Sequence, residues 1–148
     1  MPKGSTFDND LLKLIFQATG IANIADNTAT SPLTSLYVAL HTADPTTTAG
    51  SGTLGTQNAS EIAYTGYARV AVARTSGGWT VTGNVVNPAS AISFPVGTGG
   101  SGTAAYFSVG VASTGASKIL YSGAITPNIV CGSGVTPQLT TASSITES

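Results

Sequence analysis

Charged side chains are scarce in this chain of 148 residues. Asp, Glu, Lys and Arg make up 7% of it, against about 25% in an average soluble protein. The formal net charge is -1, although 41% of the residues are hydrophobic. Hydroxyl groups and backbone must therefore solvate most of the surface, and little charge repulsion opposes close contact with other copies or with a partner. This composition favours an assembly protein.

The few basic residues also exclude two classes of partner. The chain has five of them, far apart in the sequence: Lys3, Lys13, Arg69, Arg74 and Lys118. Because nucleic acids and anionic membranes bind clustered cations, we expect neither as a partner. The sequence has no apolar run of about 20 residues for a membrane span, and no apolar run behind a cationic end as in a signal peptide. We expect a protein that is made and used intact.

Metal ligands and cofactor motifs are equally few. Cys131 is the only cysteine and His41 the only histidine. A disulfide framework and a zinc site with several thiolates are therefore excluded within one chain. The glycine-rich run 97–102 lacks the lysine of a phosphate-binding loop, and we interpret it as a strand connection. We predict no metal and no cofactor.

A catalytic site is not indicated either. His41 and Asp44 could form a Ser-His-Asp set with one of the serines. However, strand positions three apart point to opposite faces, and Asp44 precedes Pro45, where a turn is expected. We interpret His41 as a residue at a strand end and Asp44 as a turn cap. The six acidic residues are isolated or belong to a helix start, so we predict no catalytic residue and a protein that is not an enzyme.

One amphipathic helix is predicted at the start of the chain, over residues 7–24. Its apolar stripe has helical spacing, and we expect Gly20 or the polar run after Ile24 to end it. The residues of the stripe are Phe7, Leu11, Leu14, Ile15, Ala18 and Ala22.

The rest of the chain has the two-residue period of strands. Residues 35–42 are apolar on both faces, which indicates a central strand, and 46–60 indicate a long exposed loop. Residues 67–74 and 79–86 predict a hairpin that turns at Ser76-Gly77-Gly78, with Arg69 on its solvated face. Shorter strands are expected at 91–96, 104–111, 118–125, 128–131 and 135–139. The chain is thus predicted to be one mainly β domain over 1–148, a jelly-roll-like antiparallel β-sandwich with one N-terminal helix.

The two ends are polar and are expected to be flexible. Residues 1–5 and the tail from Thr140 to Ser148 lack a core of their own, and such segments can become ordered on the surface of a neighbour. We predict Pro2, Lys3 and Ile145 as the residues that contact a partner.

Several segments together resemble small virion proteins of tailed bacteriophages. These segments are Leu36-Tyr37-Val38-Ala39-Leu40-His41-Thr42-Ala43-Asp44-Pro45, Tyr64-Thr65-Gly66-Tyr67-Ala68-Arg69-Val70-Ala71-Val72, Phe107-Ser108-Val109-Gly110 and Leu120-Tyr121-Ser122-Gly123-Ala124-Ile125-Thr126-Pro127. The resemblance covers most of the chain. It implies a virion structural protein that is made in the bacterial host cytoplasm. Members of this kind look like capsid cement or decoration proteins, and others carry tail-fibre labels.

Two virion functions are favoured by the sequence, and an enzyme, for instance a virion hydrolase that acts on the cell wall, remains the third possibility. As capsid cement on the outside of the head, copies of the chain, as dimers or higher oligomers, would bridge major capsid protein subunits and stabilise the head. As a receptor-binding protein of a tail fibre or tail tip, exposed aromatic residues and the loop 46–60 would contact host glycans. The sequence shows neither an attachment segment nor a fibrous repeat, which favours cement.

Overall fold

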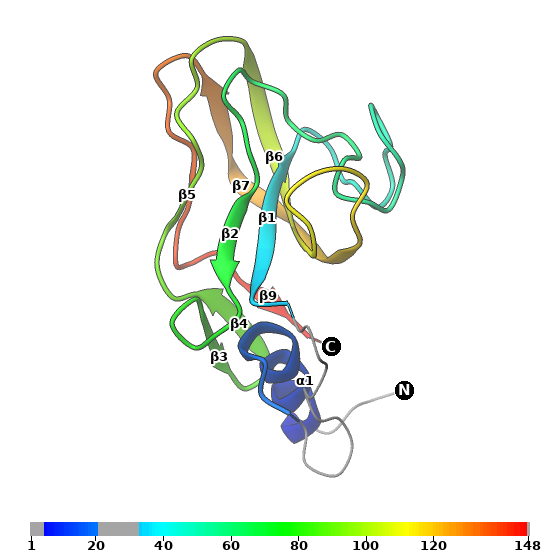
Figure 1. The fold of residues 1–148 in the computed structure, drawn as a ribbon, viewed down its shortest axis with the longest axis vertical. Coiled ribbons are helices and arrows are strands. Elements are labelled where there is room, and N and C mark those ends of the chain that lie inside the picture. Colours follow the sequence, from blue (N-terminus) through cyan, green and yellow to red (C-terminus); the bar gives the residue numbers. More distant parts are fainter. Residues whose placement is uncertain (1–4, 21–32, 148) are drawn as a thin grey trace.

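The computed structural model describes residues 5–20 and 33–147 (Figure 1). The protein is mainly β with one helix, and its antiparallel sheets form no barrel in this part of the chain, which is consistent with the predicted β-sandwich. Its elements are α1 (Ser5–Gln17), β1 (Ser35–His41), β2 (Val70–Ala73), β3 (Trp79–Thr82), β4 (Val85–Pro88), β5 (Ile92–Ser93), β6 (Ser101–Gly110), β7 (Ile119–Gly132), β8 (Gln138–Leu139) and β9 (Ile145–Thr146).

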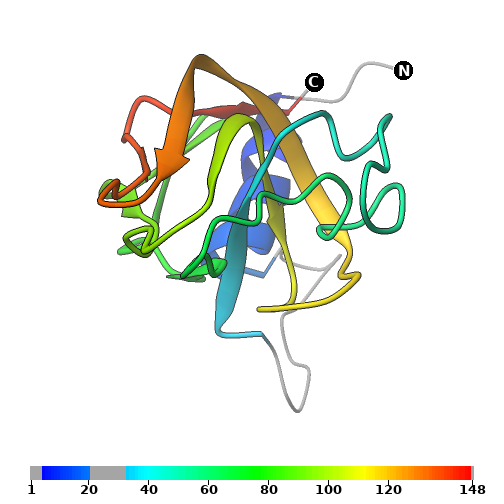
Figure 2. The ribbon, with the colours of Figure 1, turned by 90° about the horizontal axis from the view of Figure 1, so that it is seen from above.

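Three small sheets build the molecule. The largest has the strand order β2-β1-β6-β7, the second β3-β4-β9, and the third pairs β5 with β8. The predicted central strand at 35–42 is confirmed as β1, which lies between β2 and β6 and is buried along most of its length. Seen from above in Figure 2, the loops after β1 and after β6 project from the same side of this sheet.

The helix ends earlier than the sequence predicts. It stops at Gln17, and Ala18 has a positive φ of 56°, so the backbone leaves the helical region there. The Thr19 N–H donates to the Lys13 carbonyl at 3.2 Å and so satisfies one of the last carbonyls of the helix. The sequence placed a helix end at Gly20, which is two residues beyond Ala18, where the backbone leaves the helical conformation. The predicted positions 21–24 lie outside the described residues.

Buried apolar side chains join the helix to the second sheet. Leu12 and Phe16 are fully buried, and the ring of Phe16 meets Trp79 edge to face with centroids 4.8 Å apart. From the end of β2, Arg74 donates to the carbonyls of Leu14 and Ile15. The helix has no basic residue in its last turn, so a distant arginine supplies the cation that the negative end of the helix dipole favours.

The predicted hairpin between residues 67–74 and 79–86 is wrong. β2 pairs with β1, whereas β3 pairs with β4 across a two-residue turn at Gly83-Asn84. Gly83 has a φ of 61° and occupies the first central position, where a type II′ turn requires glycine. The glycine pair 77–78, from which a hairpin was predicted, thus lies in the connection between two sheets. The hairpin of β3 and β4 turns at the single glycine Gly83.

The C-terminal half also differs from the prediction. One long strand, β7, replaces the two expected at 118–125 and 128–131. The tail expected to be loose is ordered: Ile145 pairs with Val86, and the Glu147 N–H donates to the Asn84 carbonyl at 2.8 Å. The amide of Asn84 in turn donates to the Glu147 carbonyl at 2.8 Å. The chain end therefore closes the second sheet.

Candidate functional site

Two loops form a projection beside the large sheet. We call residues 42–60 and 111–118 the loop lobe, and Figures 1 and 2 show both loops on the same side of the molecule. The loops contact each other through a bridge between Thr56 and Lys118 and through the Gln57 N–H, which donates to the Ser117 carbonyl at 2.9 Å. The prediction of a long loop without strand periodicity at 46–60 is confirmed. It is only partly exposed, because Gln57 is fully buried.

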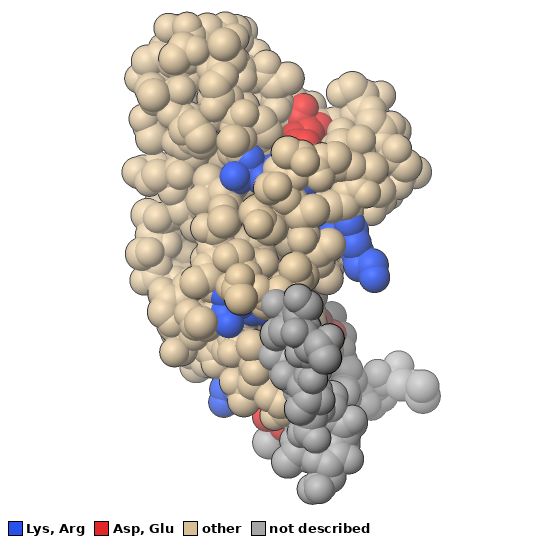
Figure 3. Space-filling model, viewed as in Figure 1, with Lys and Arg blue, Asp and Glu red and all other residues tan. Residues whose placement is uncertain are grey.

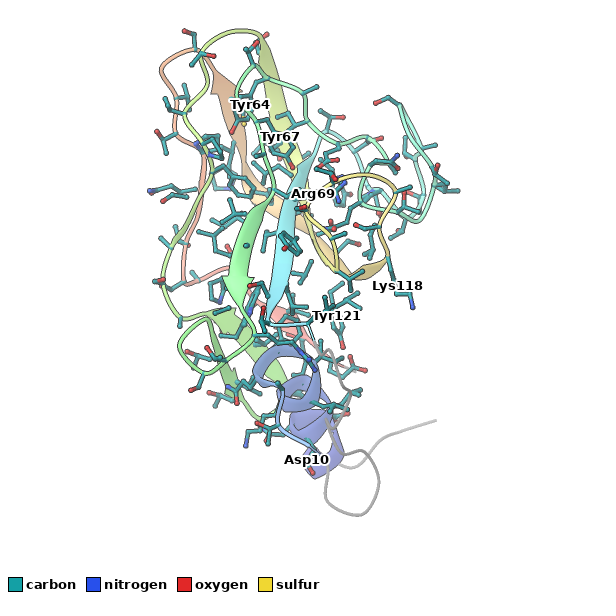
Figure 4. The ribbon with its side chains drawn as sticks, in the orientation of Figure 1. Asp10, Tyr64, Tyr67, Arg69, Lys118 and Tyr121 are labelled. Carbon is teal, nitrogen blue, oxygen red and sulfur yellow. The ribbon has the colours of Figure 1, made fainter. Side chains whose placement is uncertain are left out.

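One guanidinium group makes several of the bonds that hold this lobe against the sheet. Arg69 lies just before β2 and forms a bidentate pair with Glu61, with Nε to Oε1 at 2.7 Å and Nη2 to Oε2 at 2.8 Å. It also donates to the carbonyls of Ala112 and Gly115 at 3.0 and 2.7 Å and to the Ser117 hydroxyl at 3.0 Å. The guanidinium therefore links the lobe to the strand that carries it (Figure 4).

The burial of Arg69 corrects the sequence prediction. It was expected on the solvated face of a hairpin, but only 8% of the residue is exposed. A buried guanidinium needs a charge partner and acceptors for its N–H groups, and Glu61 with the loop carbonyls supplies both. The Tyr67 hydroxyl donates to Glu61 at 2.9 Å, and burial raises the pKa of this tyrosine well above its ordinary value.

A second polar group lies beneath the lobe. The imidazole of His41 is fully buried, with Nδ1 2.8 Å from the Ala59 carbonyl and Nε2 2.8 Å from the Ser108 hydroxyl. Because a carbonyl only accepts, Nδ1 carries the proton and Nε2 accepts from Ser108. Burial lowers the pKa of His41. Gln57 completes this group by donating to Ser108 at 3.2 Å and to the Tyr37 carbonyl at 2.9 Å.

The contact between His41 and Ser108 does not form the usual catalytic arrangement. Both residues have no exposed surface, and a backbone carbonyl takes the place of the carboxylate that orients the imidazole in a triad. Asp44 accepts from the backbone N–H and the hydroxyl of Thr46 at 2.9 and 2.7 Å, and these bonds lower its pKa. The prediction that Asp44 caps a turn is confirmed. Ser108 lies 67 positions from His41, so no sequence spacing indicated their contact.

The other sequence-predicted positions lie elsewhere. Pro2 and Lys3, which we expected to contact a partner, are outside the described residues. Ile145 is described, and its side chain is 9% exposed in the core of the chain itself. Residues 97–102 connect strands as expected, except that Ser101 and Gly102 already belong to β6. Contact of Pro2, Lys3 or Ile145 with a partner stays a prediction.

A shallow hollow opens where the lobe meets the sheet. Its volume is about 230 Å³, and Glu61, Tyr67, Arg69, Ser113 and Thr114 are among the residues that line it. Among residues 5–20 and 33–147 no group of three His, Cys, Asp or Glu side chains could hold a metal ion. No helix in this part of the chain is long and apolar enough to cross a membrane.

Comparison with known families identifies the class of protein. A family model of phage proteins matches residues 12–145, which is nearly the whole chain, and the protein is a virion structural protein of a bacteriophage. It belongs to the family described as "Podophage GP4 fiber I protein gp80". No curated protein matches the chain. The resemblance to phage virion proteins is thus confirmed, and the match gives no support to capsid cement in particular.

Proposed function

We propose that this protein is a fibre-type structural component of the virion and that its loop lobe contacts the host surface. The match of residues 12–145 to a fibre protein family carries this proposal. The fold adds a second argument, because both loops are held on one side of the sheet. Arg69 holds the loop 111–118, and the bonds of Gln57 and His41 hold the loop 42–60. A loop that is already ordered loses less conformational entropy on binding.

The chemistry of the loop 46–60 favours an uncharged ligand. Residues 46–60 contain no charged side chain and are rich in threonine, serine and glycine, and Leu54 is 52% exposed among them. Hydroxyl groups and one apolar side chain suit neutral surface sugars, for which each hydrogen bond contributes about 0.5–1.5 kcal/mol. Several copies on one virion raise the effective concentration of each further contact, so modest affinity is sufficient.

Competition for host cells tests this proposal. Purified protein should bind host cells and slow adsorption of the phage, and Leu54→Lys should weaken cell binding about tenfold by placing a charge on the lobe. Thr80→Lys is the matched control, because Thr80 is exposed on β3, next to the helix. Equal cell binding by both variants and the wild type, or no cell binding at all, would overturn the proposal.

Capsid cement, with the major capsid protein as partner, is the alternative from the sequence. It predicts that the purified protein binds expanded capsids and ignores host cells. The family match supports the fibre interpretation better. The cement interpretation expected both flexible ends of the chain to contact the capsid, but residues 145–147 pair with the second sheet of the chain itself. Binding of the purified protein to capsids without binding to host cells would favour the cement interpretation.

A further inference from the structure

A second hollow lies between β7 and the segment that leads from β8 to β9. It encloses about 290 Å³, which is near the lower limit of the clefts in which proteins bind small molecules. β7 contributes residues 124–126 to its lining, and the C-terminal segment contributes Thr140 and residues 142–144. We call this cavity the β7 hollow. None of its lining residues belongs to the loop lobe, so it is a separate feature of the surface.

An irregularity in β7 and a turn in the C-terminal segment shape the β7 hollow. Residues 125–128 of β7 lie opposite the single residue Ala105 of β6. A bulge of this kind bends a strand and changes the direction of its side chains. In the C-terminal segment, the Ser143 N–H donates to the Thr140 carbonyl at 3.0 Å, and the amide of Asn87 donates to the Ser143 carbonyl at 3.2 Å. Contacts within the chain therefore hold both walls in place.

The lining of the β7 hollow combines hydroxyl groups with apolar surface. The side chains of Thr126, Ser143 and Ser144 make no hydrogen bond within residues 5–20 and 33–147. Their hydroxyls can therefore bond to a ligand, each as a donor and as an acceptor. Phe107 and Leu139 also line the hollow, and both belong to the buried apolar core. A ligand in the hollow thus meets polar partners and apolar side chains together.

The β7 hollow contains no charged side chain. Between Arg74 and Glu147 the only charged residue in the sequence is Lys118, which belongs to the loop lobe. Figure 3 shows the same scarcity of charge on the face that it displays, where the coloured residues are few and far apart. An ionised ligand would lose water there without gaining a charge partner. A pure hydrocarbon would displace water from the hydroxyls without replacing its hydrogen bonds.

We propose that the β7 hollow binds one ring of a neutral sugar. The hydroxyls of such a ring donate to and accept from Thr126, Ser143 and Ser144. Its C–H groups pack against Phe107 and Leu139, which removes apolar surface from water. A hollow at the lower limit of ligand sites suits a single ring better than a long chain. This site goes beyond the proposed function, because it lies outside the loop lobe and does not depend on contact between the lobe and a host cell.

NMR titration of the full-length protein gives the first test. The probes are glucose, galactose, mannose and N-acetylglucosamine, and at least one should shift the amide signals of residues 124–126 and 140–144 with a dissociation constant of about 10 mM or below. The uronic acid of galactose or of glucose should bind at least about tenfold more weakly than its parent sugar, because its carboxylate finds no charge partner. No binding of any of the four sugars at about 100 mM, or binding of the uronic acids as tight as that of their parent sugars, would overturn the proposal.

Substitutions test the place of binding. Ala142→Phe should fill the hollow and abolish the sugar-induced shifts. Thr141→Phe is the matched control, because Thr141 is exposed beside Ala142 and does not line the hollow. Ser143→Ala should weaken sugar binding about three- to tenfold by removing one hydroxyl. The amide spectrum of each sugar-free variant verifies its fold, and equal sugar binding by the wild type and a folded Ala142→Phe would overturn the proposal.

Leu54→Lys separates this site from the proposed function of the loop lobe. It changes an exposed position of the lobe, so it should weaken cell binding and leave the sugar-induced shifts of residues 124–126 and 140–144 unchanged. Cell binding that depends on Leu54, with no sugar bound in the β7 hollow, would overturn this inference and support the lobe. Sugar binding in the hollow without any cell binding would support this inference and overturn the proposed function.

Discussion

The helix end and the loop lobe are held together by different forces. At the helix end, Leu12, Phe16 and Trp79 bury apolar surface, and the geometry follows from packing. At the lobe, an ion pair and a set of hydrogen bonds fix loops that have few apolar side chains of their own. Apolar burial is additive and non-directional, whereas a buried ion pair is strong only while both partners are present. Substitution of a single polar side chain should therefore destabilise the helix end only slightly, whereas it should destabilise the lobe strongly.

The largest effect is expected from Phe16→Ala. This fully buried ring contacts both Trp79 and Tyr121, so its removal leaves a cavity and should lower the free energy of unfolding by about 3–5 kcal/mol. Chemical denaturation measures the loss. Gln17→Ala is unsuitable as a control because the Gln17 amide donates to the Trp79 carbonyl. Thr80→Ala serves instead. A loss below about 1 kcal/mol would show that the helix is not part of the core.

Arg69→Met should follow, with an effect concentrated in the lobe. Removing the guanidinium leaves the Glu61 carboxylate without its charge partner, which we expect to cost about 3 kcal/mol. Hydrogen exchange should accelerate in residues 42–60 and 111–118 and change little in α1. Lys118→Met removes an exposed cation from the lobe itself and should have almost no effect. If hydrogen exchange accelerated equally in the lobe and in α1, the proposed difference between the two regions would be wrong.

Acid should weaken the protein through His41. Burial holds the pKa of this imidazole below its ordinary value of about 6.5, so below that pH the unfolded chain binds a proton that the folded chain does not. Stability should therefore fall as the pH drops below about 6.5, by at most about 1.4 kcal/mol per pH unit. An NMR titration in which His41 protonates at or above pH 6.5 would contradict this assignment.

Arg74→Met should have the smallest effect of the four. It removes the cation that binds the last carbonyls of α1, and such a cap contributes about 1 kcal/mol. Arg74→Lys keeps the charge and should recover part of this loss. Identical thermal unfolding of the wild type and Arg74→Met would show that the helix end does not depend on this cap.

The sequence predicted a helix or strand correctly where the residues of that element alone carry the pattern. β1 was found because residues 35–41 are apolar on both faces, and the helix because apolar residues recur there at helical spacing. The predicted stripe was wrong in its centre, because the fully buried side chains of the helix are Leu12 and Phe16, which the stripe did not contain. The choice of strand partners was not predictable, because the turn signal at Gly77-Gly78 is local while β2 pairs with β1 far back in the chain. The site was missed for the same reason: the partners of Arg69 lie between 8 and 48 positions away, and no spacing rule joins them.

Localisation in the virion tests the central claim most directly. Cryo-electron tomography of phage particles in which this protein carries a small electron-dense tag should show the tag on the tail fibres. Tag density distributed over the head, or particles that contain no copy of the protein, would contradict the account.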